Sequence, residues 1–105
     1  MATIGNFYTT ENGYTGIIET LTRRAEVEIK PAHKGSDKAP DFRIFLKNTD
    51  CEIGAAWATN GTRGDKYVSV KLDDPSFASP INCRLIKTGT ENTHSLIWER
   101  QRPRD

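Results

Sequence analysis

Short stretches of alternating apolar and polar residues recur along the whole chain, and turn-forming residues separate them at fairly even spacing. Alternation with a period of two places successive side chains on opposite faces of a β-strand. The clearest example is residues 24–30, in which Ala25, Val27 and Ile29 alternate with charged residues. The other expected strands are 3–9, 14–22, 42–47, 51–57, 67–72, 81–86 and 95–98. The sequence thus predicts an all-β fold with seven or eight short, mainly antiparallel strands that form a small barrel or sandwich.

Two segments leave the type of element open. Residues 17–30 also carry apolar side chains near helical spacing, so one amphipathic helix is the alternative there. The preceding Gly16 and the β-branched residues inside the segment favour strands. Asp74 followed by Pro75 is typical of a turn or a helix cap, so one short helical turn near 74–77 is the alternative to a plain turn.

Strand phase predicts where the two tryptophans lie. Trp57 shares the phase of Ile53 and Ala55, and Trp98 shares the phase of Leu96. We therefore expect both indole rings in the core rather than on a binding surface.

The length of 105 residues gives room for one hydrophobic core, so we expect a single domain over 1–105 with a frayed basic tail at 99–105. A net charge of +1 argues against protein-wide attraction to nucleic acid or to an anionic membrane. No apolar run approaches the roughly 20 residues of a membrane span, and the first residues do not resemble a secretory signal. We expect a cytoplasmic protein that has no membrane partner.

Catalytic and metal-binding signals are weak. Asp73 and Asp74 are adjacent carboxylates, but Pro75 follows them and no third acidic residue lies at a metal-loop spacing, so they predict a turn. The only soft metal ligands are scattered, without the spacing of a zinc site: His33, Cys51, Cys83 and His94. In the expected compartment the two cysteines are predicted to be buried thiols rather than a disulfide. We expect no enzyme, no catalytic or metal-binding residues and no cofactor.

Strand phase also predicts one candidate binding face. If the apolar residues of 42–47 and 67–72 face the core, their neighbours face outward. The predicted face consists of Arg43, Phe45, Lys47, Tyr67, Lys71 and Arg84. Aromatic rings among basic groups can stack single-stranded nucleic acid, at about 1–3 kcal/mol per base. The alternative is an ordinary solvated face with Phe45 packed beneath the loop at 31–40.

Several segments, in a fixed order, resemble one bacterial family. They are MATIG (1–5), GIIETL (16–21), APDFR (39–43), EIGAAW (52–57), SVKLDDPSF (69–77) and LIW (96–98). Together they span nearly the whole chain, and the family they resemble is the domain of unknown function 736. The resemblance implies a small bacterial protein, often carried on plasmids or other mobile elements, and it supplies no activity or site residue.

Two hypotheses for function follow. The favoured one is a non-catalytic protein-interaction module, an accessory protein of a bacterial mobile element that binds an unidentified protein partner. The other is binding of single-stranded DNA or RNA through the predicted face. An exposed edge strand could also be covered by a second copy of the chain, so a homodimer stays open.

Overall fold

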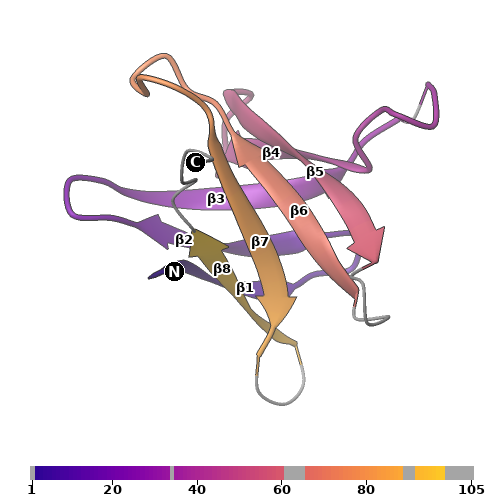
Figure 1. The fold of residues 1–105 in the computed structure, drawn as a ribbon, viewed down its shortest axis with the longest axis horizontal. Coiled ribbons are helices and arrows are strands. Elements are labelled where there is room, and N and C mark those ends of the chain that lie inside the picture. Colours follow the sequence, from indigo (N-terminus) through magenta and orange to yellow (C-terminus); the bar gives the residue numbers. More distant parts are fainter. Residues whose placement is uncertain (1, 34, 61–65, 89–91, 99–105) are drawn as a thin grey trace, which may run out of the picture.

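Eight antiparallel strands form one closed barrel in the computed structural model (Figure 1). The structure describes residues 2–33, 35–60, 66–88 and 92–98. The strands are β1 (Ala2–Thr9), β2 (Tyr14–Glu19), β3 (Arg24–Pro31), β4 (Phe42–Leu46), β5 (Glu52–Asn60), β6 (Lys66–Leu72), β7 (Ile81–Lys87) and β8 (Thr93–Trp98). Each strand pairs with the next, and β8 pairs with β1 to close the sheet. The predicted all-β fold is confirmed, and of its two architectures the protein forms the barrel.

Residues 17–30 form strands, so the alternative of a single helix is wrong. Gly16 of β2 lies opposite Val27 of β3, and the Thr20 N–H donates to the Arg23 carbonyl at 2.8 Å in the hairpin between them. The alternative of a helical turn near 74–77 is also wrong, since that segment is a plain turn. The described residues contain no helix long and apolar enough to span a membrane. The expected frayed tail at 99–105 lies outside the described residues.

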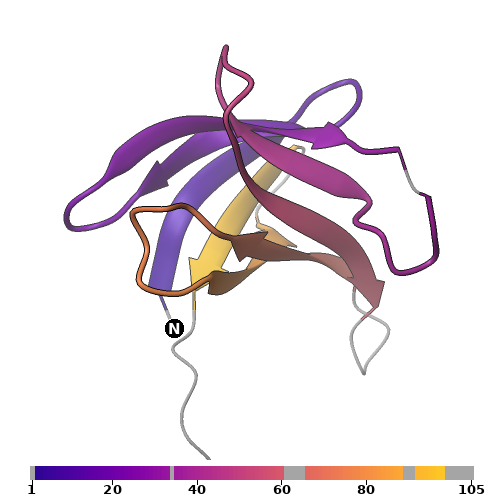
Figure 2. The same ribbon diagram turned by 90° about the horizontal axis from the view of Figure 1, so that it is seen from above.

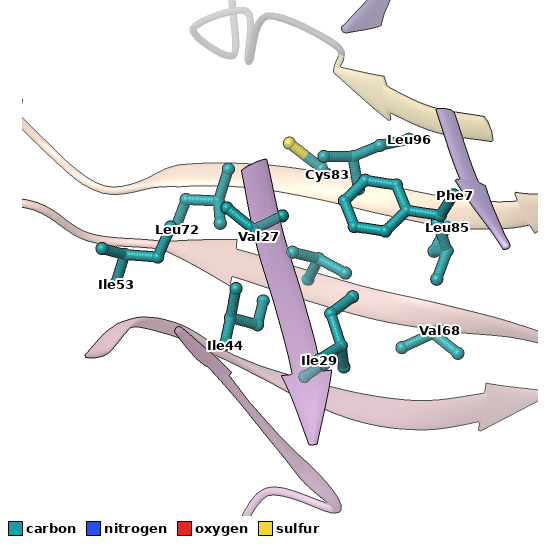
Figure 3. Packing of buried hydrophobic residues seen from close by; sticks show 12 residues of the cluster. Phe7, Val27, Ile29, Ile44, Ile53, Val68, Leu72, Cys83, Leu85 and Leu96 are labelled. Carbon is teal, nitrogen blue, oxygen red and sulfur yellow. The ribbon is translucent and has the colours of Figure 1, made fainter. Parts of the chain in front are cut away.

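The barrel interior is filled with apolar side chains (Figure 3). The buried set is Phe7, Val27, Ile29, Ile44, Ile53, Ala56, Val68, Val70, Leu72, Cys83, Leu85 and Leu96. Small barrels leave an interior just wide enough for side chains to fill. Among the described residues no buried side-chain nitrogen or oxygen lacks a hydrogen-bond partner. The central part of the barrel is therefore a packed core, and candidate sites lie at its ends or on its outer face.

A β-bulge reverses the expected phase of β5. Ile44 lies opposite Gly54 while the next residue, Phe45, lies opposite Glu52, so Ile53 is the extra residue of the bulge. Ile53 is buried, and beyond it Ala56 faces the interior while Trp57 faces outward. The prediction that Trp57 lies in the core is therefore wrong.

Trp98 does lie on the interior side of the barrel. It pairs with Cys83 across the β7–β8 ladder, and its ring packs against the buried cluster while remaining partly exposed. Both cysteines are free thiols, as predicted, and Cys83 is buried. Cys51 is exposed beyond the end of β4, so the prediction that it is buried is wrong.

Candidate binding surfaces on the barrel

The structure places the predicted binding face on the outside of the barrel. Arg43 and Phe45 in β4, Tyr67 and Lys71 in β6, and Arg84 in β7 alternate with buried residues, as their strand phase predicts. Lys47 lies in the turn after β4, where its N–H donates to the Glu26 carbonyl at 2.9 Å. Phe45 and Tyr67 are half-buried, and the four basic residues are exposed.

The two aromatic residues of this face lie at different places along the sheet. Phe45 lies opposite Glu28 on one side and Glu52 on the other. Tyr67 lies opposite Thr59, at the far end of β5 from Glu52. Phe45 and Tyr67 are therefore not side by side, and two carboxylates flank Phe45.

Each aromatic ring of the face already has a cationic neighbour. The Lys30 ammonium lies 5.5 Å from the Phe45 ring centroid, and the Arg84 guanidinium lies 5.6 Å from that of Tyr67. The guanidinium of Arg43 donates to Glu52 at 2.8 Å, so this predicted basic residue is paired with an acid. Tyr67 thus has the positive charge of Arg84 beside it, whereas Phe45 has both a positive charge, on Lys30, and carboxylates around it.

One end of the barrel opens into an apolar cavity of about 660 Å³, which we call the apolar end. Its apolar lining residues are Ile4, Ile18, Ala25, Leu46, Ile53, Leu72, Phe77, Ile81 and Trp98. Most of these side chains pack against the buried core while staying partly exposed, so the cavity is continuous with the interior. Sequence reasoning missed this cavity, because its lining comes from all eight strands, which meet only when the sheet closes.

The turn between β6 and β7 covers one side of the apolar end. Figure 2 shows that this turn and the β2–β3 hairpin project on the same side of the barrel. The Ser76 N–H donates to Asp74 Oδ2 at 2.9 Å, and the Ser76 hydroxyl donates to the same oxygen. These two bonds and the nearby Arg23 guanidinium lower the pKa of Asp74, with the hydroxyl bond the largest cause. The role of Asp74 in this structure is to shape the turn.

Arg23 connects the turn to the β2–β3 hairpin. Its guanidinium lies 5.6 Å from the centroid of the Phe77 ring and donates to the Ser76 carbonyl at 3.5 Å. Phe77 therefore has an apolar contact with the core on one side and a cation–π contact with the hairpin on the other.

Leu21 is fully exposed at the tip of the β2–β3 hairpin. Its relative exposure is 101%, against 55% for Tyr8, the other large hydrophobic residue exposed in the described part of the chain. Leu21 does not line the apolar cavity, although Thr20, Thr22 and Arg23 beside it do. The apolar end thus has a recessed part, the cavity, and a protruding part, the Leu21 tip.

A second cavity, of about 470 Å³, has a different character, and we call its location the polar end. It is lined by Tyr14, Ala58, Thr59, Asn60, Lys66, Tyr67, Val68, Leu85, Lys87 and His94. The Tyr14 ring meets His94 edge-on with centroids 5.1 Å apart, and meets Phe42 at 5.9 Å. This aromatic group braces β2 against β4 and β8.

The scattered soft ligands do not form a metal site in the described part of the chain. His33 is exposed in the loop after β3, while Cys83 lies inside the barrel. No three His, Cys, Asp or Glu side chains among the described residues are grouped to hold a metal ion.

Among the comparisons with known proteins, only the one with family models gives a match. The model of a protein family of unknown function, DUF736, matches residues 3–101. The chain belongs to this family. No curated protein and no solved structure matches the chain. The resemblance read from the sequence is thus confirmed, and any function of this DUF736 domain has to be argued from its own surfaces.

Proposed function

We propose that the protein is a non-catalytic protein-interaction module whose partner covers the apolar end and the Leu21 tip. The observation that carries this proposal is the complete exposure of Leu21 beside an apolar cavity. Contiguous exposed apolar surface on a soluble domain commonly marks an interaction site. Burying one leucine side chain stabilises a complex by about 1.5–3 kcal/mol.

The arrangement favours a protein over a small apolar molecule. A small molecule in the cavity would contact Phe77 and Trp98 but would leave Leu21 in water, because Leu21 lies outside the cavity lining. A protein surface can insert an apolar side chain into the cavity and cover the hairpin tip at the same time. Interfaces of this kind depend on a few central apolar or aromatic anchors.

Arg23 helps to order the surface proposed for the partner. By contacting Phe77 and Ser76 it holds the hairpin and the β6–β7 turn in one arrangement. A surface that is already ordered loses less conformational entropy on binding. The role of an accessory protein on a bacterial mobile element, which the family resemblance implies, belongs to this proposal.

Binding of single-stranded nucleic acid on the outer face receives less support. Phe45 lies between Glu28 and Glu52 instead of beside Tyr67, and Glu52 also pairs with Arg43. Carboxylates at these positions would repel a phosphate backbone.

Site-specific photo-crosslinking tests the proposal. A photoreactive residue at position 21, in bacterial cells, is expected to crosslink one defined protein, and the same group at position 8 is not. Leu21→Ser is then expected to reduce the affinity of that purified protein by about tenfold or more, whereas Tyr8→Ser leaves it unchanged. An equal loss of affinity in Leu21→Ser and Tyr8→Ser would contradict the proposal. The crosslinked product could instead be a dimer of the chain itself. If sedimentation then showed a dimer that Leu21→Ser abolishes, the surface would be one that covers a second copy.

A further inference from the structure

The apolar end carries a protrusion and a recess side by side. Leu21 lies fully exposed at the tip of the β2–β3 hairpin, and the residues on either side of it, Thr20 and Thr22, line the cavity. The hairpin and the β6–β7 turn project on the same side of the barrel (Figure 2), and residues of both line the cavity. An exposed leucine beside an apolar cavity provides two complementary shapes on one surface.

Two copies related by a twofold axis can bring these shapes together. In an interface of this symmetry both copies use the same surface, so each contact between the copies occurs twice. With the axis between tip and cavity, Leu21 of each copy would enter the cavity of the other and meet Phe77 and Trp98 there. Leu21 does not line the cavity of its own chain, so this contact would be made only between copies.

The charges of the hairpin and of the cavity lining balance each other. Arg23, Arg24 and Asp74 line the cavity, and Glu19 of the same hairpin lies 4.0 Å from Arg24. These two positive and two negative groups sum to no net charge. Like charges that face each other across an interface disfavour a complex. A balanced surface is therefore compatible with a second copy of itself, and it offers no net attraction to a strongly acidic or basic partner.

Hydrogen bonds within the hairpin lower the cost of burying its tip. The Thr20 N–H donates to the Arg23 carbonyl at 2.8 Å, and the Arg23 N–H donates to the Thr20 hydroxyl at 3.2 Å. These groups keep their partners when water is removed, whereas a buried polar group without a partner is costly. The Arg23 guanidinium also contacts Phe77 and Ser76, which holds the hairpin against the turn. The tip is thus ordered before it binds, so little conformational entropy is lost on binding.

We propose that the protein is a homodimer in which Leu21 of each copy fills part of the apolar cavity of the other. The inference rests on the proposed function, because it names a second copy of the chain as the partner that covers the apolar end and the Leu21 tip. The interface is confined to the ends of two small barrels, so we expect a Kd in the micromolar range rather than a permanent dimer.

Sedimentation equilibrium of the purified chain tests for the dimer. Leu21→Ser removes the tip from both copies, so a tenfold loss at each of the two contacts is expected to raise the dimer Kd about a hundredfold. Tyr8→Ser is the matched control, because Tyr8 is exposed on β1 and lies opposite Thr15, toward the other end of β2 from the hairpin. The dimer Kd of this control is expected to equal that of the wild type.

A second variant fills the cavity instead of removing the tip. Ala25 lines the cavity and lies opposite Ile18, so the ring of Ala25→Phe is expected to occupy space that Leu21 enters. Alone, this variant is expected to dimerise as weakly as Leu21→Ser. An equimolar mixture of the two variants retains one intact contact, between the tip of one and the cavity of the other, and is expected to form a heterodimer about tenfold weaker than the wild-type dimer. Circular dichroism of each variant checks that it is folded.

Photo-crosslinking identifies the contact itself. Unlabelled and isotopically labelled chains, both with a photoreactive residue at position 21, are mixed, irradiated and digested. Mass spectrometry is expected to find crosslinks of mixed isotope composition between position 21 and the cavity lining, at Phe77, Ile81 or Trp98. A crosslink between position 21 of both copies would show that the tips meet each other, and crosslinks confined to one isotope would show contact within one copy. Either result would refute the insertion.

Failure of this inference can be told apart from failure of the proposed function. A chain that stays monomeric at millimolar concentration, yet crosslinks to another protein through position 21 in cells, refutes the dimer and leaves the proposed function intact. A dimer whose Kd is unchanged in Leu21→Ser uses another surface, which also refutes the inference. A monomer that crosslinks to no protein through position 21 refutes both proposals.

Discussion

Gly16 lies directly opposite Phe7 in the β1–β2 ladder, and the Phe7 ring occupies the space that a side chain at position 16 would need. A Cβ added to Gly16 would lie 2.3 Å from the Asn6 carbonyl oxygen and 2.6 Å from Phe7 Cγ. Phe7 is the largest fully buried side chain in the described barrel. The missing side chain of Gly16 thus allows the main aromatic group of the core to enter the interior.

We therefore expect Gly16→Ala to lower the free energy of unfolding by about 1–3 kcal/mol, the usual cost of overpacking a core. Urea denaturation followed by tryptophan fluorescence measures it. Gly35→Ala is the control, since nothing beyond the adjacent residues of the chain lies within 4 Å of a Cβ added there, and its effect is expected to stay within about 0.5 kcal/mol. Equal stability of the two variants would show that the Phe7 ring moves aside without cost.

Trp57 anchors the loop between β3 and β4 from the outside of the barrel. Its indole Nε1–H donates to the Lys38 carbonyl at 3.2 Å. Trp57→Phe keeps an aromatic ring and removes the donor, so trypsin is expected to cleave faster after Lys38, with a change of about 1 kcal/mol or less in global stability. Limited proteolysis with mass spectrometry measures the rate. Cleavage after Arg43, inside β4, is the control in the same sample, and a parallel rise at both sites would indicate general loosening instead.

The strands could be predicted from sequence wherever burial alternates without interruption, as in β3, β4 and β6. The bulge at Ile53 could not, because it is defined by pairing between β4 and β5 and not by composition. One extra residue reversed the phase, and the position of Trp57 was predicted wrongly for that reason.

The two ends of the barrel were less accessible to sequence reasoning than its strands. The lining of each cavity comes from strands far apart in the chain, which only the closed sheet brings together. One signal was present in the sequence. Lys66 has the same strand phase as Val68 and Val70, so a charged side chain on the inward side of this strand could have been predicted. Leu21 fitted a helical pattern as well as a strand, and neither predicted its full exposure.

Ser76 is expected to control the ionisation of Asp74. Its hydroxyl and N–H bonds lower the pKa of the Asp74 carboxyl below its ordinary value of 3.8. Ser76→Ala keeps the backbone bond and removes the hydroxyl bond, so the pKa should move back toward 3.8. Carbon-detected NMR titration of the carboxyl group measures it, and Ser79→Ala, a serine of the same turn, is the control.

The same bonds make a pH-dependent contribution to stability. A carboxyl whose pKa is lower in the folded state than in the unfolded state stabilises the fold at pH values above the unfolded value, here near 3.8. That contribution is lost as the pH falls through the folded value. The stability difference between wild type and Ser76→Ala is therefore expected to shrink below about pH 4. A difference that grows on acidification would mean that the hydroxyl bond favours the protonated carboxyl.

The two thiols are expected to differ sharply in reactivity. Cys83 lies inside the barrel opposite Val70, and burial raises the pKa of its thiol from 9.0 to about 12. The thiolate is the reactive form, and this rise lowers its fraction about a thousandfold at neutral pH. Cys51 is exposed after β4.

A maleimide reagent is therefore expected to label Cys83→Ala rapidly through Cys51, and to label Cys51→Ser only after unfolding in denaturant. Mass spectrometry at successive times gives both rates, and denatured samples of each variant supply the maximum. If Cys51→Ser reacted as fast when native as when denatured, β7 would have to separate from its neighbours readily, and Cys83 could not belong to a closed and packed barrel.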